Sequence, residues 1–358
     1  MRKILINSKI EAIAEEYTYK LLKGQTINTQ DLSTVNLDKI PKIFKRLIDL
    51  YMKLVTEERS EYREYVKNII DKLPEIIKLK PSKFDDFKNT YFNNLTSEQL
   101  CSKVPDLGDK QNDEAVAQLP QGKSYKKDSY NFGEKKFYEL IVEAMCYNEV
   151  QKTVIRPYMK RMGLNTCVYC NASYAVATDD RKATFQVDHY LPKSKYPFLC
   201  ISFFNLYPTC MHCNQIKSKE TTYNFCLYTK DPKELNPFKF SIDDKSIIKY
   251  LLSNDFELLK VNLKSDILTK EAEEHFNFFH LGGLYSQFSD EIEEIVWKAK
   301  IYNESYRNQL LAVYKKKFPF NMYAFKRFYL GFYPDVKDVH KRPLTLLKQS
   351  IAKEMGLE

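Results

Sequence analysis

The chain has 358 residues, of which 44% are hydrophobic and 29% are charged, with 56 Lys and Arg against 47 Asp and Glu. That length exceeds the ~250–300 residues at which single hydrophobic cores stop growing, so more than one structural unit is expected. The composition excludes a disordered chain, and no apolar stretch approaches the ~20 residues needed to span a bilayer. The first residues lack the apolar region and cleavage site of a secretory signal, so we expect a cytoplasmic protein with no membrane partner.

Glycine motifs exclude several classes of enzyme. The sequence has only 9 glycines and contains no dinucleotide-binding, P-loop or nucleophile-elbow pattern. Rossmann, P-loop and α/β-hydrolase chemistry are therefore not expected. The formal net charge of +9 is compatible with an acidic partner but does not identify one.

The first part of the chain, residues 1–100, is predicted to be helical. Apolar residues recur there at steps of three and four, first over 40–55 and then from Tyr62 to Leu73, with Pro74 expected to end the second helix. Residues 101–135 lose this pattern and contain prolines, glycines and many polar residues, which predicts a long polar loop. The helical pattern returns over 136–164, where Pro157 is expected to kink or divide the helix.

Residues 165–225 differ from their surroundings because they contain two pairs of cysteines, short strand-like runs and several prolines. We expect a strand over 184–187 and a short helix from Cys213 onward. Residues 226–358 are again predicted to be helical, with Ser289 as the N-cap of a helix whose first turn is acidic. The predicted fold class is therefore mainly α, with a small α+β insert between helical N- and C-terminal regions.

Two Cys-x-x-Cys knuckles, Cys167 with Cys170 and Cys210 with Cys213, give the most specific signal in the sequence. One knuckle places two thiolates on one Zn²⁺, and two knuckles complete a tetrahedral, closed structural site. A cytoplasmic protein keeps its thiols reduced, so we expect structural zinc rather than disulfides or a redox site. His212 is an alternative to one thiolate, although four cysteines are the simpler set. The spacer between the knuckles exceeds the roughly 15–20 residues of an ordinary zinc ribbon, which indicates an insert.

The remaining cysteines and three of the histidines lie outside any comparable pattern. We expect the cysteines to be small core residues. They are Cys101, Cys146, Cys200 and Cys226. The histidines are expected to be ordinary surface or core residues, namely His275, His280 and His340.

The chemistry is expected in and just after the insert, at Asp188, His189 and Asn214. A free histidine has a pKa of about 6.5, so His189 suits a general base at neutral pH. Asp188 alternates with it on a strand, so the carboxylate can hold a cation while the imidazole faces the water nucleophile. The amide oxygen of Asn214 is a hard ligand that favours Mg²⁺ or Mn²⁺. Each residue alone has a common structural explanation, but their combination between two zinc knuckles favours a nuclease site.

This part of the sequence resembles the HNH, or ββα-metal, nuclease motif. The resemblance is carried by Asp188, His189, Pro192, Ser194, Asn205, Cys210, Cys213, Asn214 and Lys217 at the motif's spacing. With Asn214 in third place, it is similar to the His-Asn-Asn variant in the HNH domain of RNA-guided CRISPR nucleases. The wider run over 165–220 resembles HNH proteins of bacterial anti-phage systems, including the Septu and retron-associated ones, whereas residues 1–135 show no such resemblance.

The resemblance implies a treble-clef-like ββα-metal core over 165–225 that hydrolyses DNA phosphodiester bonds. Its catalytic residues would be His189, Asp188, Asn205 and Asn214, with Asp188 and Asn214 holding a catalytic Mg²⁺ or Mn²⁺. Asn205 is implied to brace the loop that orients His189 without touching the metal. The implied partners are double-stranded DNA and an ATPase or sensor protein.

Basic residues near the motif are candidates for phosphate contacts. Lys193 and Lys195 follow the Asp-His pair, and Lys217 lies three residues after Asn214, hence on the same helical face. Residues 298–358 contain 13 Lys and Arg against 5 Asp and Glu, interleaved with aromatic residues. This pattern suits a surface that follows nucleic-acid phosphates, but it is also typical of an aromatic core with a solvated basic face.

The sequence therefore predicts a metal-dependent HNH endonuclease that cuts DNA as the effector of an anti-phage system. Two alternatives stay open. The first is a non-catalytic zinc-binding adaptor for nucleic acid or protein, in which Asp188 and His189 are vestigial. The second is a restriction or mobile-element nuclease with its own sequence specificity.

Overall fold

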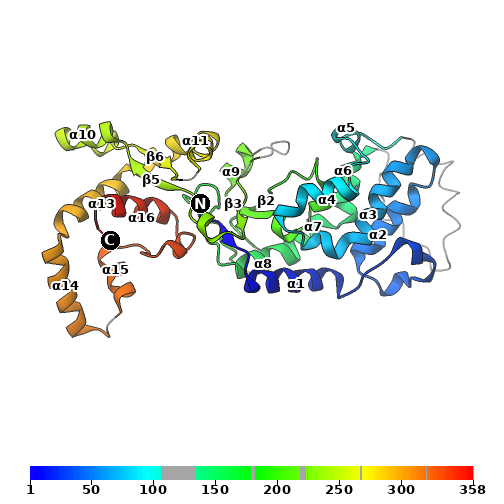
Figure 1. Ribbon diagram of the computed structural model, residues 1–358, viewed down its shortest axis with the longest axis horizontal. Coiled ribbons are helices and arrows are strands. Elements are labelled where there is room, and N and C mark those ends of the chain that lie inside the picture. Colours follow the sequence, from blue (N-terminus) through cyan, green and yellow to red (C-terminus); the bar gives the residue numbers. More distant parts are fainter. Residues whose placement is uncertain are drawn as a thin grey trace.

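The computed structural model describes residues 1–105, 134–178, 182–217, 223, 225–266, 268–319 and 321–357. Within these residues the chain is mainly helical with short strands, which confirms the predicted fold class at that level. Figure 1 shows an elongated molecule in which strands β2 (Gln186–His189) and β3 (Leu206–Thr209) lie between an N-terminal and a C-terminal group of helices. Most of the polar loop predicted over 101–135 lies outside the described residues.

The N-terminal helices pack through the apolar stripes that the sequence predicts. Helices α2 and α3 contact each other and bury Phe44, Leu47, Ile69 and Ile70. The helices of this group are α1 (Ser8–Leu22), α2 (Lys42–Lys53), α3 (Ser60–Ile77), α4 (Phe84–Tyr91), α5 (Ser97–Leu100), α6 (Phe137–Ala144), α7 (Tyr147–Val150) and α8 (Arg156–Arg161).

The expectation that Pro74 ends a helix is wrong. Helix α3 continues through Pro74 to Ile77, and its last turn buries Ile76 and Ile77 completely. A proline inside a helix removes one backbone hydrogen bond, and burial of two isoleucines offsets that loss. Packing therefore overrides the local preference at this position.

The expected break at Pro157 lies elsewhere. Cys146, with a left-handed φ of 56°, separates α6 from α7. The chain then continues through a π-helix, Gln151–Ile155, into α8, where Pro157 lies in the first turn. The helix does not end at this proline: Arg156, the residue before it, still donates its backbone N–H to the carbonyl of Gln151, five residues back, in the wider π-type spacing.

The centre of the molecule consists of two strands and a helix. Strand β2 pairs antiparallel with β3, which places Asp188 opposite Tyr207 and His189 opposite Leu206. Strand β3 leads into α9 (Met211–Ile216), and α9 contacts β2. The helix begins before the expected Cys213 because Cys210 is its N-cap, with the Cys210 thiol accepting from the backbone N–H of Cys213 at 3.5 Å.

The C-terminal group contains the predicted helices and, in addition, two strands that were not predicted. Strands β5 (Lys239–Ile242) and β6 (Val261–Lys264) pair antiparallel, and α16 packs on β5. A further short parallel pair joins β1 (Ile4–Leu5) to β4 (Tyr228–Thr229). The helices are α10 (Asp244–Ser253), α11 (Thr269–Phe278), α12 (Leu281–Tyr285), α13 (Ser289–Ile301), α14 (Glu304–Lys317), α15 (Met322–Leu330) and α16 (Thr345–Glu354).

Ser289 is not the N-cap that the sequence predicts. It is the first residue of α13, and its hydroxyl donates to the carbonyl oxygens of Ser286 at 3.0 Å and Leu259 at 3.3 Å. The hydroxyl thus fixes the preceding turn instead of capping the helix. Among the described residues, no helix is both long and apolar enough to cross a membrane.

Candidate functional site

The four cysteines of the two knuckles come together in the interior. Their sulfur atoms all lie within 4.8 Å of one another, and those of Cys170 and Cys210 are 3.9 Å apart. Burial raises the pKa of the Cys167 thiol well above its ordinary value, so this thiol needs a cation beside it to ionise. Four sulfurs at this spacing fit Zn²⁺. The predicted grouping is confirmed: this cluster can hold a metal such as zinc, and His212 is exposed on α9.

The residue after the first knuckle, Asn171, ties this knuckle to the C-terminal part of the chain. It is fully buried and has a left-handed φ of 55°. Its amide nitrogen donates to the carbonyl of Val339 at 2.9 Å, and its amide oxygen accepts from the N–H of Leu346 at 3.0 Å. Its backbone carbonyl accepts from the N–H of Leu344 at 2.8 Å. Residues 339–346 therefore hold the turn that follows the first knuckle, although they are far from it in the sequence.

Strand β2 presents the predicted Asp-His pair. Asp188 is 7% exposed, and its Oδ2 accepts from the Tyr169 hydroxyl and from the Lys217 ammonium, each at 2.7 Å. Burial raises the pKa of the Asp188 carboxyl, while Lys217 and Tyr169 act in the opposite direction. The carboxylate is therefore held by two donors inside the protein.

His189 is buried and kept neutral. Its Nε2 lies 2.9 Å from the carbonyl oxygen of Cys200. A carbonyl only accepts, so Nε2 carries the proton and Nδ1 keeps the lone pair. Burial lowers the pKa of His189 to about 3, with a smaller contribution from the nearby Lys193 charge. The Tyr147 ring lies against the imidazole with ring centres 4.9 Å apart, which helps to fix its orientation.

Asn205 lies behind this pair, where it joins both ends of the intervening loop. Its amide nitrogen donates to the carbonyls of Leu191 at 3.1 Å and Leu199 at 3.2 Å, and its amide oxygen accepts from the Leu191 N–H at 2.8 Å. The residue after Leu199 is Cys200, whose carbonyl holds His189. Asn205 thus joins the two ends of this loop; it is fully buried and is not among the residues that line the cavity described next.

One cavity of about 680 Å³ is lined by three of the four residues expected to be catalytic, Asp188, His189 and Asn214. Asn214 comes from α9, and its amide nitrogen donates to the Gln186 side chain at 2.5 Å. This contact leaves the Asn214 amide oxygen for another partner. A carboxylate and an amide oxygen are hard donors, the kind of ligand that Mg²⁺ and Mn²⁺ prefer.

The three expected phosphate-contact lysines have different environments. Lys193 lines the same cavity, with its ammonium 4.8 Å from the centre of the Tyr147 ring. Lys195 is half-buried and is not among the cavity-lining residues. Lys217 lines the cavity, but its side chain is only 2% exposed and is paired with Asp188. Lys217 thus shares the cavity with Asn214, as its helical spacing predicts, while its ammonium is paired with Asp188.

Several residues of the site were not found from the sequence. Tyr147 and Arg156, from the helices before the first knuckle, line the cavity, and Gln186 does so from β2. Gln186 had a usable signal because it alternates with Asp188 and therefore shares its strand face. Tyr147 and Arg156 had none, because only the tertiary fold places them against the insert. Tyr169 lies between two predicted zinc-ligand cysteines, and nothing in the sequence indicates that its hydroxyl contacts Asp188.

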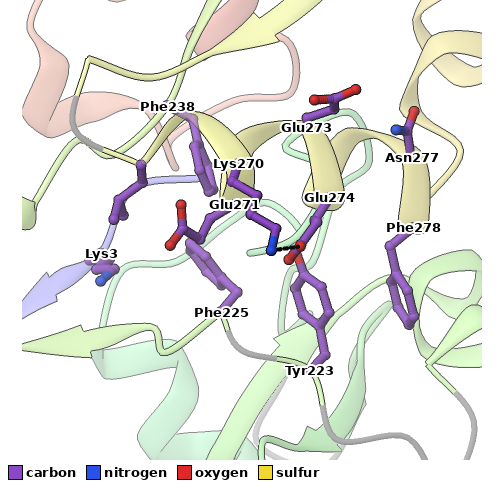
Figure 2. A pocket seen from close by; sticks show the side chains of 11 residues that line it. Lys3, Tyr223, Phe225, Phe238, Lys270, Glu271, Glu273, Glu274, Asn277 and Phe278 are labelled. Carbon is purple, nitrogen blue, oxygen red and sulfur yellow. Dashed lines mark ion pairs between the residues drawn. The ribbon is translucent and has the colours of Figure 1, made fainter.

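A second cavity, of about 760 Å³, shares no lining residue with this one (Figure 2). It is lined by aromatic rings, including Tyr223, Phe225 and Phe238, and by charged residues of α11. None of the residues predicted to be functional lines it.

The cysteines and histidines outside the predicted site differ in their burial. Cys146 and Cys200 are buried, as predicted for core cysteines, whereas Cys101 and Cys226 are only partly buried. His275 and His340 are buried, and His280 is exposed.

Comparisons with known proteins give one relationship. The chain is 31% identical to the Septu protein PtuB of Bacillus thuringiensis over a 101-residue alignment, which covers 22% of this chain and 38% of that protein. The chain thus matches well under half of the length of this curated relative. No protein-family model matches the chain, and no solved structure matches it.

Proposed function

We propose that the protein is a metal-dependent HNH endonuclease that hydrolyses DNA phosphodiester bonds. The observation that carries the proposal is the single cavity lined by Asp188 and His189 from β2 and by Asn214 from α9. The order of antiparallel β2 and β3 followed by α9, beside a four-cysteine cluster, supports a ββα-metal core over 165–225.

The residues of the chain can divide the hydrolytic chemistry between them. His189 is neutral and has its lone pair on Nδ1, so it can take the proton from a water that attacks phosphorus, although its pKa of about 3 makes it a weaker base than the free histidine expected from the sequence. The Cys200 carbonyl fixes the imidazole through Nε2, and Asn205 holds the loop that carries this carbonyl. Lys193, which lines the cavity, is proposed to contact the substrate backbone, and Lys195 to do so outside it.

Asp188 and Asn214 would hold the catalytic Mg²⁺ or Mn²⁺. When bound, such a cation neutralises charge on the phosphate and on the leaving oxygen. The four cysteines would hold a structural Zn²⁺ that takes no part in the reaction.

The similarity to a Septu protein supports a role in anti-phage defence, in which this chain would be the effector. By the same similarity we propose an ATPase or sensor protein as a partner. The partner would restrain or direct the nuclease, because an unregulated DNA nuclease would damage its own host.

The proposal is tested by plasmid nicking with Mg²⁺, comparing the wild type with His189→Ala. Loss of the general base should lower the cleavage rate by about 10²–10⁴-fold. A matched control is His280→Asn, which changes an exposed histidine at a left-handed φ of 51° to a residue that tolerates this conformation. Parallel reactions with RNA of the same length identify the preferred substrate.

Cleavage by His280→Asn but not by His189→Ala supports the catalytic proposal. Equal cleavage by His189→Ala and wild type contradicts it. If the wild type, alone and with its partner, binds but never cleaves nucleic acid, the adaptor alternative replaces the nuclease. Cleavage confined to one short sequence favours the restriction or mobile-element alternative.

A further inference from the structure

Two buried side chains converge on one oxygen of Asp188, and each comes from a different cysteine knuckle. Tyr169 lies between Cys167 and Cys170, and its hydroxyl donates to Oδ2 at 2.7 Å. Lys217 follows the second knuckle at the end of α9, and its ammonium donates to the same Oδ2 at 2.7 Å. Both donors thus contact the same carboxylate oxygen, Oδ2, of a residue that also lines the cavity.

All three protons of the Lys217 ammonium have hydrogen-bond partners inside the protein. Besides Asp188 it donates to the backbone carbonyls of His189 at 2.5 Å and Tyr190 at 3.2 Å. A lysine ammonium has three protons, and here each has an oxygen partner. A phosphate contact would require Lys217 to give up one of these bonds and to leave a site where its side chain is 2% exposed. The geometry therefore favours a role toward the carboxylate instead of the substrate.

Tyr169 is equally fixed. Its ring is fully buried and stacks on Phe279 with centroids 4.6 Å apart. Because the ring cannot move without disturbing this packing, its hydroxyl lies at one place relative to Asp188. A hydrogen bond from a buried neutral donor to a carboxylate is among the stronger ones in proteins.

We infer that Tyr169 and Lys217 are positioning residues that hold Asp188 by Oδ2 and so present Oδ1 as a single-oxygen ligand for the divalent cation. The inference rests on the proposed function, because it concerns the same carboxylate. It assigns each knuckle a second task, since closure of the four-cysteine cluster also sets the distance from Tyr169 and Lys217 to Asp188. Side chains that orient a ligand in this way tune metal affinity.

Tyr169→Phe tests the inference with the smallest possible change, in the zinc-loaded full-length protein. The readout is Mn²⁺ affinity, measured by the electron paramagnetic resonance signal of free Mn²⁺ without nucleic acid. Loss of the hydroxyl should weaken Mn²⁺ binding by about tenfold. The matched control is Tyr207→Phe, which removes another buried hydroxyl, one that accepts from the Leu227 N–H at 2.7 Å and does not contact Asp188. This control should bind Mn²⁺ as the wild type does.

A second pair of variants separates positioning from phosphate binding. Lys217→Met removes both an orienting donor and a positive charge beside Asp188, so its readout is DNA binding: metal-free DNA affinity and its salt dependence should stay unchanged. Lys193→Met, which removes a cavity-lining lysine, should lower the salt slope of DNA binding by about 1 and leave Mn²⁺ affinity within about twofold. Tyr169→Phe keeps the test available if Lys217→Met does not fold.

The outcomes are distinct from those of the nuclease test. Unchanged or tighter Mn²⁺ binding by Tyr169→Phe, or a salt slope lowered by Lys217→Met as it is by Lys193→Met, overturns the positioning roles even if the wild type cleaves DNA. Weakened Mn²⁺ binding with no cleavage by the wild type overturns the nuclease proposal and supports the positioning roles. A wild type that binds no Mn²⁺ overturns both.

Discussion

Three histidines in this molecule are neutral because the protein surrounds them. Burial lowers the pKa of His189, His275 and His340 to about 3 in each case. The unfolded chain takes up a proton on each below its ordinary pKa of about 6.5, while the folded chain does not. Stability from these groups is therefore fully present above about pH 6.5 and is lost as the pH falls toward 3.

We expect the free energy of unfolding to decrease between pH 6.5 and pH 3 with a slope of about 1.4 kcal/mol per pH unit for each buried histidine. His275→Gln removes one titrating group and keeps an N–H donor for the Tyr169 carbonyl, which His275 contacts at 2.6 Å. Its slope should be shallower than that of the wild type by about 1.4 kcal/mol per pH unit. Urea unfolding at closely spaced pH values measures both slopes, and parallel curves would contradict the prediction.

The sequence predicts which residues line the site better than it predicts the contacts of their side chains. The motif places Asp188, His189 and Asn214 because each follows a fixed position relative to a strand or a knuckle, and the structure brings all three to one cavity. Helical spacing also places Lys217 beside Asn214, and both line this cavity, but it could not show that the Lys217 ammonium is paired with the buried Asp188.

The sequence predicts a helix reliably where only one face of that helix is buried. Apolar periodicity gives α2 and most of α3 because their stripes face each other. It fails at Pro74, where a local rule is weaker than the burial of the next turn. It also misses β5 and β6, short strands of four residues each that leave too few alternations to outweigh the surrounding helical pattern.

The two knuckles are the elements whose stability depends on a ligand. We expect one zinc ion per chain in the purified protein, lost in Cys210→Ser because a closed four-sulfur site loses a ligand, whereas serine can still cap α9. The variant should be less stable by about 3 kcal/mol or more. Elemental analysis and thermal unfolding measure both quantities. Cys101→Ser, outside the cluster and partly buried, should keep its zinc, and a Cys210→Ser protein with full zinc content would contradict the assignment.

Over the whole molecule, the predicted site lies in the middle and the most basic helix end lies toward one extremity. Figure 1 shows α14 and α15 projecting from the C-terminal group, away from β2 and β3. The last turn of α14 carries Lys315, Lys316 and Lys317, all exposed. A duplex that crosses the central cavity and also reaches α14 would be held at two separate places.

Replacement of Lys315, Lys316 and Lys317 by Gln should weaken DNA binding uniformly across sequences. Each phosphate contact contributes about 0.9 to the slope of log affinity against log salt, so the slope should fall by about 2–3. Fluorescence anisotropy at several salt concentrations measures it. The control replaces Lys9, Lys20 and Lys23, which are exposed at or near α1, and changes the net charge equally. Equal losses in both variants would indicate a general charge effect rather than a binding surface on α14.

The hydrogen bonds that hold Asn171 come from residues that are synthesised much later than Asn171 itself. Val339, Leu344 and Leu346 complete the turn that follows the first knuckle, and they are synthesised long after Cys167 and Cys170. During translation the ribosome delivers all four cysteines before it delivers the segment that closes the turn beside them. We therefore expect this turn, and the proposed nuclease centre beside it, to form only after residues 339–346 have been synthesised, so that shorter chains carry the motif without the proposed activity.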